Sequence, residues 1–103
     1  MRLFHPILAF VDLETTDTGA GIDAITEIGI VRVEADPAGA APPAVTEWST
    51  LVNPGVPIPP EIQALTGITN AMVRDAPAFA RIADEVRARI SGAVFVAHNA
   101  RFD

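Results

Sequence analysis

The sequence contains no cysteine among its 103 residues. A chain without cysteine forms no disulfide and no thiolate metal site, and it suits a reducing compartment. It also has no run of eighteen apolar residues and no signal-peptide pattern, because the apolar stretch at 7–11 is too short for either. We therefore expect a cytoplasmic protein with no membrane partner.

Positive charge is scarce as well, with seven Lys and Arg against thirteen Asp and Glu and a net charge of −6. A protein that held nucleic acid mainly by its own charge would normally have the opposite sign. A nucleic-acid partner would thus need local attraction or bound cations, although an acidic balance is also typical of ordinary solubility. Half of the residues are apolar, which is enough for one small core and predicts a single unit over 1–103.

Three strands joined by short connections are predicted in the first half, as in an antiparallel meander, at 6–14, 26–34 and 44–52. The third strand carries polar residues along its length, which indicates a place toward the edge of a sheet. In the second strand, alternation predicts that Val31 and Val33 point inward and that Arg32 points outward.

The second half predicts two short helical turns, a longer helix and one more strand. Gly67 is expected to end the first turn and Thr69 to cap the second. Apolar residues recur with helical period over 77–90, and 93–98 is apolar enough to be a fully buried strand. A helix followed by such a strand indicates a parallel crossover onto the first strand.

The stretch "FVDLETT", residues 10–16, places Asp12 and Glu14 at the end of an apolar run. Residues i and i+2 of a strand share one face, so the two side chains project together, with their Cβ atoms about 7 Å apart. Two anions on one face are costly unless they share a proton or bind a cation, and oxygen ligands suit Mg²⁺ or Mn²⁺. The alternative is a strand end that emerges into solvent with both acids hydrated.

Asp103 offers a third carboxylate. If the strand at 93–98 lies parallel to the first strand and next to it, both end at the same edge of the sheet, and Asp103 follows one helical turn later. Three carboxylates at one edge can hold two divalent ions, which activate a water and stabilise the leaving oxygen of a phosphodiester.

Two motifs carry a resemblance to a known family. "FVDLETT" resembles the first motif of the DnaQ-like (DEDDh) 3′–5′ exonucleases, and "HNARFD", residues 98–103, resembles the second. This family includes the proofreading epsilon subunit of bacterial DNA polymerase III. The resemblance implies an α/β, RNase H-like fold in which three antiparallel strands and then a parallel strand form a mixed sheet flanked by helices. It further implies that 1–103 is the N-terminal part of one exonuclease domain, without the last strand and helices.

The resemblance also assigns roles to individual residues. Asp12, Glu14 and Asp103 correspond to catalytic acids that bind two divalent ions, Mg²⁺ or Mn²⁺. The residues that correspond to substrate-binding positions are Thr15, Thr16, Leu65, Thr66 and Asn99.

The family's third motif, a histidine general base followed by a fourth aspartate, has no counterpart in these 103 residues. His98 belongs to the second motif and is expected to be structural rather than the base. A general base contributes about 10²- to 10⁴-fold in rate, so we expect this chain to be inactive, or nearly so, by itself.

The partners implied by the resemblance are a DNA 3′ end, single-stranded or frayed, and either a DNA polymerase subunit or a fused second nuclease domain of GIY-YIG type. RNA is also possible, because the related oligoribonucleases share these motifs. The alternative hypothesis is a non-catalytic fragment that binds nucleic acid or a polymerase.

Overall fold

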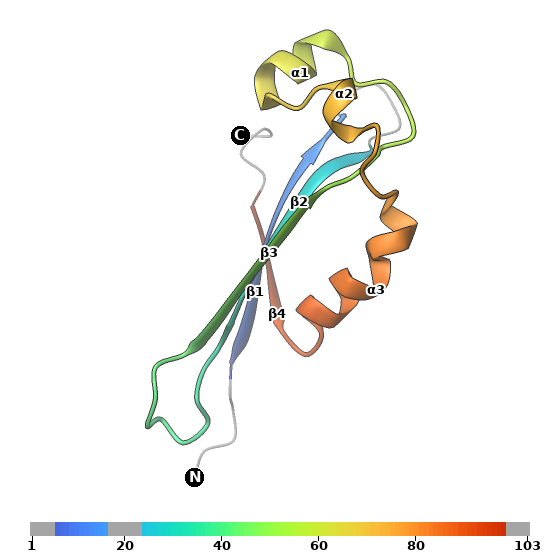
Figure 1. Cartoon of the computed structure of the whole chain (residues 1–103). Helices are drawn as coiled ribbons and strands as arrows, with labels where there is room; N and C mark the ends of the chain where they lie inside the picture. Colours follow the sequence, from blue (N-terminus) through green and yellow to red (C-terminus); the bar gives the residue numbers. More distant parts are fainter. Residues whose placement is uncertain (1–5, 17–23, 99–103) are drawn as a thin grey trace.

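The computed structural model describes residues 6–16 and 24–98 and contains a four-stranded mixed sheet. The strands lie in the order β3-β2-β1-β4 (Figure 1), with bounds β1 Ile7–Thr15, β2 Ile25–Glu34, β3 Ala44–Leu51 and β4 Val94–His98. β1 pairs antiparallel with β2, β2 pairs antiparallel with β3, and β4 pairs parallel with β1. The expected topology and the edge position of the third strand are confirmed.

The helix α3, Phe79–Ile90, crosses one face of the sheet and provides the connection to β4 (Figure 1). Its apolar side chains Ile82, Val86 and Ile90 pack against the main core. Because these side chains recur at helical spacing, one stripe of the helix is apolar and can be withdrawn from water. The residues of the core are Ala9, Val11, Ile28, Ile30 and Val52.

The face of β2 that α3 covers differs from the predicted one. Ile30 is buried on the covered face, so Val31 and Val33 lie on the opposite face, and their expected inward position is wrong. Arg32 lies on the covered side, where its Nη1 donates to the backbone carbonyls of Arg89 (3.0 Å) and Ser91 (2.9 Å). The period of two determines which residues share a face, whereas helix packing determines which face is covered.

A second, smaller core lies beneath the short helices α1, Pro60–Thr66, and α2, Asn70–Val73. Gly67 has φ 79° and its N–H donates to the carbonyl of Gln63, so it ends α1 as expected. The hydroxyl oxygen of Thr69 accepts from the N–H of Met72 at 3.2 Å, which confirms the predicted cap of α2. The residues of this core are Ile58, Ile62, Ile68 and Val73.

Strand β4 is at the edge of the sheet rather than fully buried, which corrects a second expectation. Val94 is 53 % exposed and Phe95 is 56 % exposed. An apolar strand is buried only where another layer packs on it, and α3 packs on β1 and β2. Within residues 6–16 and 24–98, none of the helices has the length and apolar character needed to cross a membrane.

Candidate metal centre

Asp12 and Glu14 lie on the same face of β1, close to its C-terminal end. Asp12 is opposite Gly29 of β2 on one side and His98 of β4 on the other. The parallel strands β1 and β4 therefore end at one edge, as the sequence predicts. Asn99 and Asp103 follow His98 in the sequence but lie outside the described residues, so the convergence of three acids stays a prediction.

A small hollow of about 190 Å³ lies beside the two acids. The hollow is smaller than the roughly 300 Å³ at which pockets for whole small-molecule ligands begin. It is lined by Asp12, Leu13, Glu14, Glu27, Gly29 and Ser49.

The carboxylate of Glu14 is the clearest candidate ligand for a cation. Its Oε1 is buried and, among the described residues, no hydrogen-bond donor reaches it. Asp12 on the same face is exposed, and none of the described residues that line the hollow is basic. A buried acceptor without a donor costs about 1–3 kcal/mol, so carboxylate oxygens in this setting fit a hard cation such as Mg²⁺ or Mn²⁺.

The described residues do not complete a metal site. No group of three His, Asp or Glu side chains within residues 6–16 and 24–98 is placed to hold an ion. The ligand set expected from the sequence depends on Asp103, whose position the structure does not describe.

Three residues of the hollow, Glu27, Gly29 and Ser49, were not predicted as site residues. Gly29 is opposite Asp12 and leaves room beside it, because a Cβ at this position would meet only the Cβ of Ser49, at 3.7 Å. A glycine inside a strand often marks a close approach of a ligand, so the sequence held a signal for Gly29. Glu27 and Ser49 could be found only from the strand register.

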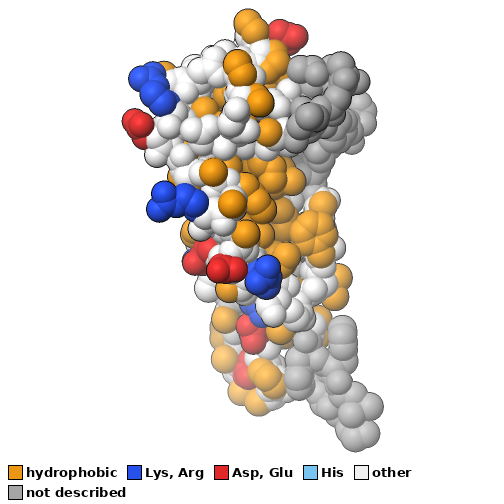
Figure 2. All heavy atoms as spheres, turned by 90° about the vertical axis from the view of Figure 1, so that its right-hand side faces the viewer, with side chains coloured by type: hydrophobic (Ala, Val, Ile, Leu, Met, Phe, Trp, Pro, Cys, Tyr) orange, Lys and Arg blue, Asp and Glu red, His pale blue; other side chains and the backbone are white. Residues whose placement is uncertain are grey.

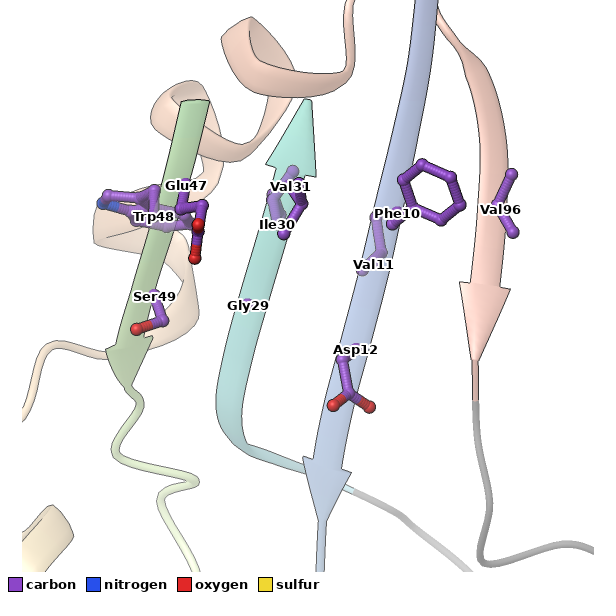
Figure 3. Close-up of a pocket in the computed structure, with 10 residues that line it drawn as sticks. All are labelled: Phe10, Val11, Asp12, Gly29, Ile30, Val31, Glu47, Trp48, Ser49 and Val96. Carbon is purple, nitrogen blue, oxygen red and sulfur yellow. The ribbon is translucent and has the colours of Figure 1, made fainter. Parts of the chain in front are cut away.

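A larger, apolar hollow of about 370 Å³ adjoins the acids on the uncovered face of the sheet. Figure 3 shows Phe10 on β1 with its ring turned toward Val96 on β4, and Asp12 farther along the same strand. Asp12 and Gly29 line both hollows, so the acidic site borders directly on apolar surface.

Two of the predicted substrate residues lie next to the acids. Thr15 is the last residue of β1 and is half-buried. Thr16 is buried, its hydroxyl oxygen accepts from the N–H of Ala24 at 3.0 Å, and its own N–H donates to the carbonyl of Ala24 at 2.8 Å. Thr16 thus joins the two ends of the segment 17–23.

The other two described substrate candidates are on α1. Leu65 is 66 % exposed, whereas the hydroxyl of Thr66 donates to the carbonyl of Ile62 (2.9 Å) and accepts from the N–H of Ile68 (3.1 Å). Leu65 is free to contact a ligand, and Thr66 contributes to the end of the helix. Their assignment as substrate-binding residues stays a prediction.

Among the described residues, the face that carries α3 has no concentrated basic surface (Figure 2), since the Arg side chains are scattered among acidic and hydrophobic ones. Arg87 pairs with Asp84 at 3.4 Å, and the Nε of Arg89 pairs with Glu85 at 2.6 Å. Arg87 is exposed and Arg89 is half-buried, and both are paired with acids of the same helix rather than arranged as a track for phosphates.

The sequence is similar to known exonucleases over almost all of its length. The profile of the family RNase_T, described as "Exonuclease", matches residues 9–103. The 3′–5′ exonuclease DinG of Staphylococcus saprophyticus is 39% identical over 98 residues, which are 95% of this chain and 10% of that protein. A protein of Mycobacterium tuberculosis whose name describes a bifunctional exonuclease/endonuclease is 45% identical over 109 residues. The match covers 100% of this chain and 16% of that protein. A DNA polymerase III subunit epsilon-like protein of Rhodobacter capsulatus is 43% identical over 99 residues, with 93% and 14% covered. The chain thus spans about a tenth to a sixth of the length of these relatives.

Solved structures of nucleases share the fold. Exonuclease X in complex with 5′-overhanging duplex DNA superposes with a TM-score of 0.58 at 33% identity, covering 93% of this chain and 51% of that one. The nuclease domain of 3′hExo, a DEDDh family member bound to rAMP, gives a TM-score of 0.66 at 16% identity, with 94% and 52% covered. Product-bound exonuclease I gives a TM-score of 0.73 at 16% identity, and the match covers 93% of this chain and 22% of that one. The fold is thus the RNase H-like fold of the exonucleases, as the sequence predicts.

Proposed function

The chain belongs to the RNase_T exonuclease family, and we propose that its parent domain is a two-metal 3′–5′ exonuclease of the DEDDh type. The observation that carries this proposal is the placement of Asp12 and Glu14 on one face of β1, at the edge where β4 also ends. The Oε1 atom of Glu14 supports it, since this buried acceptor has no hydrogen-bond donor among the described residues and a divalent cation would satisfy it.

The proposed roles follow from the resemblance of the two motifs to those of the family. Asp12, Glu14 and Asp103 hold two divalent ions, which when bound supply an activated water and charge stabilisation at the leaving oxygen. Leu65 packs on the terminal base or sugar, and Thr66 holds the end of α1 that presents it. Thr15, Thr16 and Asn99 position the 3′-terminal nucleotide beside the acids.

The proposed substrate is a nucleic-acid 3′ end, and DNA is favoured over RNA. Exonuclease X was solved with duplex DNA and 3′hExo with rAMP, so both chemistries occur among structures that share the fold. The epsilon-like and bifunctional relatives favour a DNA polymerase subunit or a second nuclease domain as partner. We place the protein in the cytoplasm.

We further propose that the 103-residue chain has little or no nuclease activity, because it has no counterpart of the family's histidine base and fourth aspartate. The loss of a general base costs about 10²- to 10⁴-fold in rate. Binding of metal should survive this loss, whereas a chain that had become only a binding module for nucleic acid or a polymerase would not need the acids.

Calorimetric titration with Mn²⁺ tests the metal site on the chain itself. We expect uptake by the wild type, loss of uptake in Asp12→Asn, and uptake close to wild type in Glu47→Gln, which removes the same charge from an exposed position on β3. The absence of uptake by the wild type would refute the proposed metal site.

The same preparation should then be incubated with 3′-labelled single-stranded DNA and with RNA in Mg²⁺ or Mn²⁺. We expect no release of mononucleotides from either strand above the Asp12→Asn background. Rapid metal-dependent release would show that the chain supplies its own base, and the strand that is cut would identify the substrate class.

A further inference from the structure

Glu27 of β2 is directly opposite Glu14 of β1 in the antiparallel register. The Cβ atoms of such opposite residues lie about 4.5–5.5 Å apart, and their side chains project from the same face of the sheet. Both side chains line the hollow of about 190 Å³ beside Asp12. The fold therefore adds a fourth carboxylate next to the acids that the motif supplies.

Nothing in the described part of the chain neutralises this pair. None of the salt bridges within residues 6–16 and 24–98 includes Glu14 or Glu27, and Oε1 of Glu14 is buried without a donor. Like charges directly opposite in a sheet are destabilising. Glu27 is half-buried and lines the hollow that Glu14 also lines, so the two carboxylates share one space.

We infer that Glu27 is a positioning residue for the divalent ions, an inference that rests on the metal site proposed above. It acts through Glu14. The negative charge of Glu27 disfavours rotation of the Glu14 carboxylate toward β2 and increases the attraction of the hollow for a cation. The fold tolerates the repulsion in the metal-free chain, and a bound cation relieves it.

If Glu27 has this role, Glu27→Gln should stabilise the metal-free chain and weaken its binding of metal. Removal of the repulsion should raise the melting temperature of the metal-free chain by about 2–4 °C. Loss of the charge should weaken Mn²⁺ binding about tenfold, as is typical when a residue that supports a ligand is changed. A purely structural role for Glu27 would instead lower the melting temperature and leave the affinity of the folded protein unchanged.

The experiment measures thermal unfolding in EDTA and Mn²⁺ titration by calorimetry on the whole 103-residue chain. Glu27→Gln is compared with Glu27→Asp, which keeps the charge, and with Glu47→Gln, which removes one charge from the neighbouring strand. We expect Glu27→Asp to recover most of the affinity and to lose the thermal gain, and Glu47→Gln to change the affinity less than twofold.

The outcomes separate this inference from the proposed function. If the wild type binds Mn²⁺ and Glu27→Gln binds it equally well, Glu27 has no positioning role and the metal site stands. If Glu27→Gln and Glu47→Gln weaken Mn²⁺ binding equally, the effect comes only from the net charge of the chain, and the inference is overturned. If the wild type takes up no Mn²⁺, both the metal site and the role of Glu27 are refuted.

Discussion

Two carboxylates in this chain have contrasting surroundings. Asp36, in the turn between β2 and β3, accepts from the N–H groups of three alanines, and these backbone bonds, led by Ala41, lower the pKa of its carboxyl. Oε1 of Glu14 has no donor within the described residues. A carboxylate whose acceptors are satisfied stabilises its turn, whereas one left unsatisfied in a buried position costs stability and indicates a ligand.

Thr16 provides a prediction at this scale. Thr16→Val keeps the shape of the side chain but leaves the N–H of Ala24 without its acceptor. We expect the free energy of unfolding to fall by about 1 kcal/mol, measured by urea denaturation. Thr46→Val, at an exposed position of β3, is the control and should change it by less than about 0.5 kcal/mol. Equal effects of the two substitutions would show that the Thr16 hydroxyl does not hold the ends of the segment 17–23.

Among the elements, α3 depends on the sheet for its stability. None of its residues is fully buried, and its capping position Ala78 makes no side-chain hydrogen bond. Its C-terminal end is held by Arg32 of β2, whose guanidinium donates to two backbone carbonyls. The guanidinium of Arg89 also lies 5.2 Å from the centre of the Trp48 ring on β3. The helix is thus fastened to the sheet by two cationic side chains as well as by its apolar stripe.

The substitution Arg32→Met tests this attachment. It keeps much of the aliphatic length and removes the donors, so we expect a loss of about 1.5 kcal/mol in the free energy of unfolding. Arg81→Met, at an exposed position of α3, should lower the free energy of unfolding by less than about 0.5 kcal/mol. Hydrogen exchange should report faster exchange in the last turn of α3 for Arg32→Met alone. Unchanged exchange there would mean that the apolar stripe suffices.

The whole molecule is elongated, with extents of 54 × 29 × 20 Å and a radius of gyration of 16.3 Å. A compact domain of this length would have a radius of gyration near 13 Å. Two separate cores and an uncovered sheet face account for the difference. The uncovered face exposes apolar side chains, among them Phe10, Val45, Val94 and Val96. Exposed apolar patches and a bare edge strand favour association between molecules.

We therefore predict that the chain self-associates through this face. Sedimentation measured over a range of protein concentrations should show a rising average mass. Val94→Lys places a charge on β4 and should weaken the association about tenfold, since burial of one such side chain is worth about 1.5 kcal/mol. Val56→Lys, at an exposed position outside the sheet, should associate like the wild type. A wild type that stays monomeric at all concentrations would contradict the prediction.

Local sequence patterns were sufficient to predict much of the structure of this protein. The period of two put Asp12 and Glu14 on one face, the glycine and threonine signals placed the ends of α1 and α2, and the motifs identified the exonuclease family. These properties depend on neighbours in the chain or on short patterns, so they can be read residue by residue.

Other properties arise from contacts between distant segments, which no local pattern encodes. Packing of α3 determined that Ile28 and Ile30, rather than Val31 and Val33, are covered. The register of β1 and β2 brought Glu27 opposite Glu14 and Gly29 opposite Asp12. Strand pairing and helix packing are selected by the burial of the whole apolar set, so the surroundings of the two acids became apparent only when the segments were assembled.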